Sequence, residues 1–122
     1  MSVFDTSALL AILYDEAGKE NAAKRLDGGV ISLVNVAEVV GDLVLQGGDL
    51  VGATDIVAKF GLEWLEPTVE QTMRAAGMRV IMDLSLGDRF CIALAQARGD
   101  SIVTADRVWA DHDFGVPVEL IR

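Results

Sequence analysis

The sequence is poor in the residues from which disulfides, zinc centres and acyl-transfer sites are built. Among its 122 residues there are one cysteine, one histidine and two prolines. The single Cys91 excludes an internal disulfide, fits a reducing compartment and shares an apolar helical face that favours a core position. His112 lies between two aspartates, which is more typical of an exposed loop than of a catalytic base. No arrangement of His, Asp and Ser indicates acyl chemistry.

Basic residues are also scarce. The chain has 10 Lys and Arg against 19 Asp and Glu, which gives a formal net charge of −9. General nucleic-acid binding depends on cationic side chains that neutralise phosphates, so this charge disfavours it. The excess of acid instead favours a basic partner or a bound cation.

Long apolar runs are missing, although hydrophobic residues make up 52% of the chain. No stretch approaches the roughly 18 apolar residues that span a membrane. The N-terminus has no basic segment and Asp5 interrupts its first apolar run, so we expect no signal peptide and a cytoplasmic location with no membrane contact. The length predicts one domain with one core, covering residues 1–122.

Short apolar strands alternate with helices along the chain. Five strands are predicted: Ser2–Phe4, Val30–Leu33, Leu62–Leu65, Ser101–Thr104 and Val118–Ile121. Helices are expected between them, including Thr6–Asp15, Lys19–Leu26 and a helix after Gly87 that ends near Arg98. This alternation predicts a parallel α/β sandwich.

One further helix is predicted after Pro67. Its apolar face is expected to run through Val69, Met73, Ala76 and Val80. The methionines of this region are expected to fill the core, with a dimer surface as the alternative: Met73, Met78 and Met82.

Four acidic residues fall where strands are predicted to give way to helices: Asp5, Glu38, Asp88 and Asp106. A parallel α/β sheet gathers such junctions along one edge, at the carboxyl ends of its strands. Each acid has a simpler explanation, since Asp is a preferred N-cap and Glu38 and Asp88 follow Asn35 and Ser85 at capping-box spacing.

Helical position weakens the capping explanation for two of these acids. Asp5 and Asp88 each share a helix face with apolar residues one turn later, so both carboxylates are expected to point towards the core. A carboxylate placed there needs a compensating partner, and no Lys or Arg shares either stripe. If the four acids converge, their repulsion favours a bound cation. Oxygen ligands without His or Cys suit Mg²⁺ or Mn²⁺ better than Zn²⁺.

These motifs carry a resemblance to a known family. The segments Phe4–Leu10, Ser32–Glu38, Leu86–Asp88 and Thr104–Arg107 resemble those of PIN domains, and the length and order of the acids are similar to VapC-type toxins of VapBC toxin–antitoxin pairs. The resemblance covers essentially the whole chain. It implies a three-layer α/β/α fold with a central, mainly parallel sheet, and a magnesium-dependent endoribonuclease.

The resemblance also assigns roles to residues and partners. Asp5, Glu38, Asp88 and Asp106 would form the catalytic acidic site, in which we expect Asp5 and Asp88 to bind Mg²⁺, with Mn²⁺ able to substitute. The implied partners are an RNA substrate, a second copy in a homodimer and a VapB-like antitoxin that inserts a basic side chain beside the acids. Such an insertion gives charge-assisted hydrogen bonds.

Several neighbouring residues are candidates for a supporting role. The hydroxyls of Thr6, Ser7 and Thr104 are suited to hydrogen-bond the carboxylates, with capping and turn formation as the alternative. Arg89 and Arg107 each follow a site acid and are candidates for phosphate contact, with a solvated helix position as the alternative. Three further acids compete for a place in the site: Asp42, Asp111 and Asp113.

Other functions are open at this point. A PIN-like binding module without catalysis is one, although all four acids are present. A nuclease that acts on other nucleic acids is a second. A signalling receiver domain is disfavoured, because Thr6 stands where such a domain needs a second acid and no Lys occurs after Lys59.

Overall fold

A five-stranded parallel sheet forms the centre of the protein, for which a computed structural model describes residues 1–122. All neighbouring strands run parallel, in the order β3-β2-β1-β4-β5. Their bounds are β1 Ser2–Phe4, β2 Val30–Ser32, β3 Glu63–Leu65, β4 Ser101–Thr104 and β5 Val118–Leu120. The five predicted strands are confirmed, within one residue at their ends.

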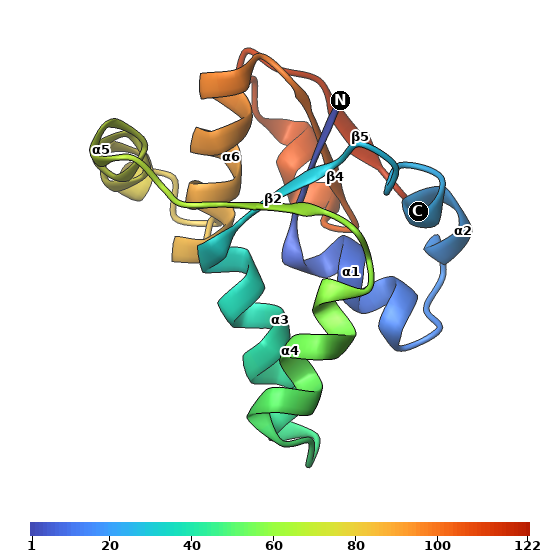
Figure 1. Cartoon of the computed structure of the whole chain (residues 1–122). Coiled ribbons are helices and arrows are strands. Elements are labelled where there is room, and N and C mark those ends of the chain that lie inside the picture. Colours follow the sequence, from blue (N-terminus) through green and yellow to red (C-terminus); the bar gives the residue numbers. More distant parts are fainter.

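Six α-helices connect and cover the strands. They are α1 Thr6–Leu13, α2 Lys19–Ala23, α3 Leu33–Leu45, α4 Leu50–Ala58, α5 Val69–Gly77 and α6 Leu86–Arg98, with short 3-10 helices η1 Met78–Val80 and η2 Arg107–Asp111. In Figure 1, α3 and α4 form a hairpin that extends away from the sheet. None of the helices combines the length and the apolar character needed to cross a membrane.

The sheet is covered on both faces, because successive strand residues point to opposite sides. Phe4, Ile31 and Val103 pack into the apolar core beneath α1, α3 and α4. The residue before each of them packs into a second core with α6 on the other face: Val3, Val30 and Ile102. The predicted three-layer α/β/α arrangement is therefore confirmed, with every strand parallel.

The sheet has a topological switch point between β1 and β4, where the order in which successive strands are added changes side. Strands β2 and β3 lie on one side of β1, whereas β4 and β5 lie on the other. Phe4 is aligned with Val103, and the Asp5 N–H donates to the Val103 carbonyl oxygen at 3.0 Å. Parallel α/β sheets place ligand sites at the carboxyl ends of strands at such a switch point. Asp5 and Asp106 follow the two strands that meet there.

The prediction for α5 was wrong in one respect. Ala75 is its buried residue, whereas Val69 and Met73 are exposed, as is Val80 in η1. Helix α5 lies against α6 outside the sheet (Figure 1), so it needs only a narrow buried stripe. Among the three methionines, Met78 packs against the core, but Met73 and Met82 are exposed.

Candidate acidic site

Asp5 lies buried at the end of β1, with 3% of its surface exposed. It occupies the N-cap position of α1, but its side chain makes no capping hydrogen bond. Its Oδ2 atom instead accepts hydrogen bonds from Ser7 Oγ at 2.6 Å and Thr104 Oγ1 at 2.9 Å. Capping therefore does not explain this carboxylate, which is held by the hydroxyl of Ser7, two residues later, and by that of Thr104 in β4.

The two hydroxyls also fix the segments that carry them. Thr104 Oγ1 accepts from the Asp106 N–H at 3.1 Å, and Ser7 Oγ accepts from the Ala105 N–H at 2.9 Å. The end of β4 is thereby tied to the start of α1, with Asp5 between them. Ser7 and Thr104 thus both hydrogen-bond the Asp5 carboxylate.

Glu38 projects from α3 with an exposed side chain. Its Oε1 atom accepts hydrogen bonds from Thr6 Oγ1 at 2.5 Å and from Asn35 Nδ2 at 3.0 Å. The sequence suggested Asn35 as a cap, but Ser32 caps α3 by accepting from the Val34 N–H. Asn35 is a fully buried residue of the first turn whose part in the site was not predicted, although its spacing of three from Glu38 was visible.

Asp88 and Asp106 have the local capping roles that the alternative explanation offered. Asp88 Oδ2 accepts from the Ser85 N–H at 2.8 Å, and Ser85 Oγ accepts from the Asp88 N–H at 3.2 Å, so the two form a capping box at the start of α6. Asp106 Oδ1 accepts from the Val108 N–H at 3.0 Å and caps η2. Both caps fix the direction of the carboxylate.

The four carboxylates share one pattern of hydrogen bonding. In each, one oxygen accepts from protein donors, whereas the other oxygen receives no hydrogen bond from the protein. The second oxygens of Asp5, Asp88 and Asp106 are not buried, and Glu38 is itself an exposed residue. Four oriented carboxylates thus keep one oxygen each for water, a cation or a basic side chain.

Burial and the charges of neighbouring acids raise the pKa values of Asp5 and Asp88. Burial is the main reason why the pKa of Asp5 is raised to about 6, and the charges of Asp88 and Glu38 raise it further against the Ser7 and Thr104 hydrogen bonds. The pKa of Asp88 is also raised, first by burial and then by the charges of Asp106 and Glu38. No Lys or Arg forms an ion pair with any of the four. The structure therefore brings the four acids into one uncompensated electrostatic cluster.

The donor set fits a hard divalent cation that keeps its waters. In the present side-chain conformations no three His, Cys, Asp or Glu side chains approach closely enough to hold one ion together. Mg²⁺ usually keeps several waters and takes only one or two carboxylates directly. Asp5 and Asp88 each keep one oxygen free of protein hydrogen bonds, and a donor set of carboxylates favours Mg²⁺ or Mn²⁺.

The three competing acids lie outside this cluster. Asp42 accepts a hydrogen bond from the Tyr14 hydroxyl, which raises the pKa of Tyr14. Asp113 accepts from the Gly115 N–H within its own turn, and Asp111 is exposed at the end of η2. None of them contributes to the raised pKa of Asp5 or Asp88.

The two candidate arginines differ in position. Arg89 is 8% exposed, and its guanidinium donates to the carbonyl oxygens of Ser85 at 3.3 Å and Ala75 at 3.2 Å. It therefore joins α6 to α5 and is not presented to a ligand, in contrast to the expected phosphate contact. Arg107 is exposed at the start of η2 and forms no ion pair.

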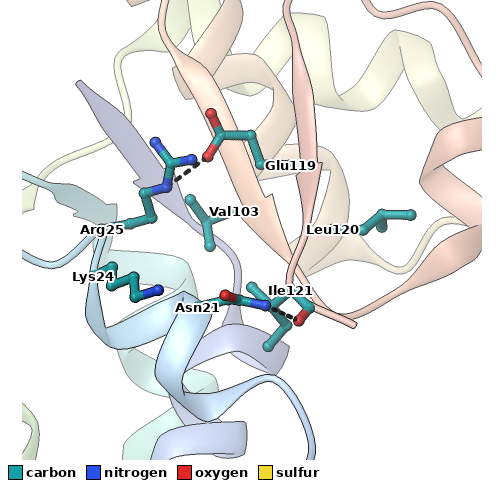
Figure 2. Close-up of a pocket in the computed structure, with 7 residues that line it drawn as sticks. All are labelled: Asn21, Lys24, Arg25, Val103, Glu119, Leu120 and Ile121. Atoms are coloured by element: carbon teal, nitrogen blue, oxygen red, sulfur yellow. Dashed lines mark hydrogen bonds and ion pairs between the residues drawn. The ribbon is translucent and has the colours of Figure 1, made fainter.

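A separate pocket of about 240 Å³ lies between α2 and the end of the sheet (Figure 2). Its lining contains none of the four acids: Asn21, Lys24, Arg25, Val103, Glu119, Leu120 and Ile121. Arg25 Nε lies 3.2 Å from Glu119 Oε2, and Asn21 Nδ2 donates to the Ile121 carbonyl oxygen at 3.0 Å. The arginine is thus neutralised within the pocket, which leaves Lys24 as its one unpaired cation.

The fold and the site define an α/β protein with an acidic centre at the switch point of a parallel sheet. Residues 2–115 match the model of the PIN domain family, and the chain belongs to that family. No curated protein matches the sequence significantly.

Solved structures with the same fold are similar over nearly the whole chain. A toxin–antitoxin complex from Klebsiella pneumoniae is 19% identical with a TM-score of 0.75, and covers 100% of this chain and 98% of its own. VapBC2 from Rickettsia felis, bound to a promoter DNA fragment, is 16% identical with a TM-score of 0.74 and coverage of 98% and 97%. VapBC-5 from Mycobacterium tuberculosis is 22% identical with a TM-score of 0.64 and coverage of 99% and 97%.

Proposed function

We propose that this chain is a metal-dependent nuclease of the PIN family that hydrolyses RNA phosphodiester bonds internally and acts as the toxin of a toxin–antitoxin pair. One observation carries the proposal. Four carboxylates from distant parts of the chain lie within electrostatic reach of one another at this edge of the sheet, each with one oxygen fixed by the protein and one free. No Lys or Arg offsets the negative charge of these carboxylates, and a bound cation would do so.

The chain's residues would hold Mg²⁺, or Mn²⁺ in its place, chiefly through Asp5 and Asp88. When bound, such an ion lowers the pKa of a water and polarises a phosphoryl oxygen. Glu38 and Asp106 would accept hydrogen bonds from waters in the site. Ser7 and Thr104 prevent rotation of the Asp5 carboxylate, and so keep its free oxygen in one position.

The net charge of −9 restricts how RNA is held. A bound divalent ion reduces the repulsion between the acids and a phosphate. Arg107 is the exposed cation nearest in sequence to a site acid, and we assign it the phosphate contact. Arg89 is left out of this role because its guanidinium is buried against two carbonyls.

Partner proteins follow from the acidic site and from the exposed apolar surface. We propose that a VapB-like antitoxin places a basic side chain against the free carboxylate oxygens, where charge-assisted hydrogen bonds are strong. The similar structures from Klebsiella pneumoniae and Mycobacterium tuberculosis belong to toxin–antitoxin systems, which supports this assignment. We propose a homodimer through the exposed side chains around α5, namely Val69, Met73, Val80, Met82 and Leu86.

Cleavage of a mixed, structured RNA pool tests the proposal. Wild type, Asp5→Asn and Asp55→Asn are purified identically and assayed with Mg²⁺, Mn²⁺ or EDTA. Asp55 is an exposed acid of α4, so its substitution changes the charge equally but away from the site. We expect metal-dependent cutting by wild type and Asp55→Asn alone.

Other outcomes separate the alternatives. Equal cutting by Asp5→Asn would assign the activity to a contaminant or to another site. Cutting of single-stranded DNA but not RNA would identify a nuclease with a different substrate. RNA binding without cleavage in any condition would indicate a binding module.

A further inference from the structure

We propose that Asn35 and Gly87 are positioning residues, which together with Thr6 form a socket that holds the Glu38 carboxylate in the acidic site. The inference rests on the proposed function for its purpose, but the socket itself is defined by contacts of the metal-free chain. Three segments far apart in sequence contribute to it, from the starts of α1, α3 and α6.

The Asn35 amide is the centre of the socket. This side chain is fully buried, and its Nδ2 atom lies 3.0 Å from Glu38 Oε1, 3.1 Å from the Gly87 carbonyl oxygen and 3.2 Å from Thr6 Oγ1. A carboxylate and a carbonyl can only accept, so their positions fix the amide with its nitrogen towards them. Glu38 is thereby connected to the first turn of α6, next to Asp88.

The oxygen of the same amide has no hydrogen-bond partner in the protein. Asn35 Oδ1 is buried and accepts no hydrogen bond. An unpaired buried acceptor is destabilising, and such groups are rare in folded proteins. The acceptors around Nδ2 nevertheless hold the Asn35 amide in this orientation. We infer that this orientation serves the geometry of the site at a cost in stability.

Gly87 completes the socket through its missing side chain. A Cβ atom added there would overlap the Glu38 carboxyl group. Gly87 is a buried residue in the first turn of α6, and its backbone has no positive φ that would require glycine, so alanine there would reduce the entropy of the unfolded chain. Helix stability therefore favours alanine at this position, whereas the position of the Glu38 carboxylate requires glycine.

The first arm of the test separates these two requirements. Gly87→Ala is compared with Gly41→Ala, because an added Cβ at Gly41 of α3 meets no atom within 4 Å. We expect both variants to keep or raise the melting temperature of the metal-free protein. Only Gly87→Ala should weaken the stabilisation by Mn²⁺, shifting the midpoint of the thermal-shift titration at least about tenfold.

The second arm removes the amide. Asn35→Ala is compared with Asn21→Ala, which removes a single side-chain hydrogen bond, the one from Asn21 Nδ2 to the Ile121 carbonyl oxygen. We expect a weaker Mn²⁺ midpoint for Asn35→Ala and no change for Asn21→Ala. For cleavage, the Mn²⁺ concentration at half-maximal rate should rise in the socket variants, while the RNA KM stays unchanged.

A third arm needs no metal. Gly87→Ala and Gly41→Ala are each measured in the wild-type and Glu38→Ala backgrounds. Trimming Glu38 removes the overlap, so Gly87→Ala should raise the melting temperature by about 3 °C more in that background, whereas Gly41→Ala should act equally in both. Equal effects of Gly87→Ala in the two backgrounds would overturn the socket.

The arms also separate failure of the inference from failure of the proposed function. If wild type neither binds Mn²⁺ nor cuts RNA, the proposed nuclease is wrong, and the metal-free arm still decides whether Glu38 is held. If wild type binds Mn²⁺ and Gly87→Ala and Asn35→Ala bind it equally well, the nuclease stands and the positioning role is refuted.

Discussion

Asp5→Asn is expected to make the metal-free protein more stable at neutral pH while abolishing its function. Burial and neighbouring charges raise the pKa of Asp5 from 3.8 to about 6. The folded state therefore binds the proton more tightly than the unfolded state. The free energy of unfolding should fall as the pH rises from about 4 through about 6, and should then stay low.

The size of the effect follows from the shift. A rise of about two pKa units corresponds to roughly 3 kcal/mol of destabilisation by the ionised carboxylate. Asparagine removes the charge and keeps an oxygen that can accept from Ser7 and Thr104, although its amide nitrogen needs a new partner. We therefore expect a net gain of about 1–3 kcal/mol at pH 7.5 and nearly none at pH 4.

Urea denaturation in EDTA at both pH values measures the change. Asp55→Asn is the matched control and should alter stability by less than about 0.5 kcal/mol. A variant Asp5→Asn that is destabilised at pH 7.5, or that gains equally at both pH values, would refute the reasoning. Adding Mn²⁺ should reverse the order, because the ion stabilises wild type alone.

Four further substitutions test other parts of the structure. Thr104→Val removes a buried donor to Asp5 and leaves the Asp106 N–H unpaired. Urea denaturation should therefore show that the free energy of unfolding falls by about 1–3 kcal/mol. A fall below about 0.5 kcal/mol, the size expected for a neutral surface change, would contradict this. Arg89→Met should lower stability by about 1–3 kcal/mol without changing the salt dependence of RNA binding, because its guanidinium bonds two carbonyls. Arg107→Met should leave stability unchanged and should reduce the salt dependence of RNA binding. If instead Arg89→Met reduced the salt dependence and Arg107→Met did not, Arg89 would be the phosphate contact. Met73→Glu should give a monomer in sedimentation, and an unchanged dimer would place that interface elsewhere.

The local pattern of the sequence predicted the layers and the placement of the acids. Strand alternation and helical spacing are local signals, and they placed Asp5 and Asp106 at the ends of β1 and β4. Parallel pairing then brings these ends together without any knowledge of side-chain contacts. The sequence predicted less well the surface of α5, because an apolar helical stripe looks the same whether it faces a core or solvent.

Details that depend on long-range packing were missed for physical reasons. Arg89 follows Asp88, but successive helix residues point about 100° apart, so it turns away from the site towards α5. Asn35 has a spacing that fits a cap, yet Ser32 takes that role and leaves the amide free to join α3 to α6. Its contact with Gly87 spans 52 residues, beyond the reach of local pattern.

Calorimetric titration of metal-free protein with Mn²⁺ tests the central claim most directly. The claim is that Asp5 and Asp88 keep free oxygens for a hard cation. Wild type and Asp55→Asn should bind saturably with equal affinity, whereas Asp5→Asn and Asp88→Asn should each bind at least about tenfold more weakly, or about 1.4 kcal/mol. Absence of binding by wild type, or equal binding by all four proteins, would contradict the account.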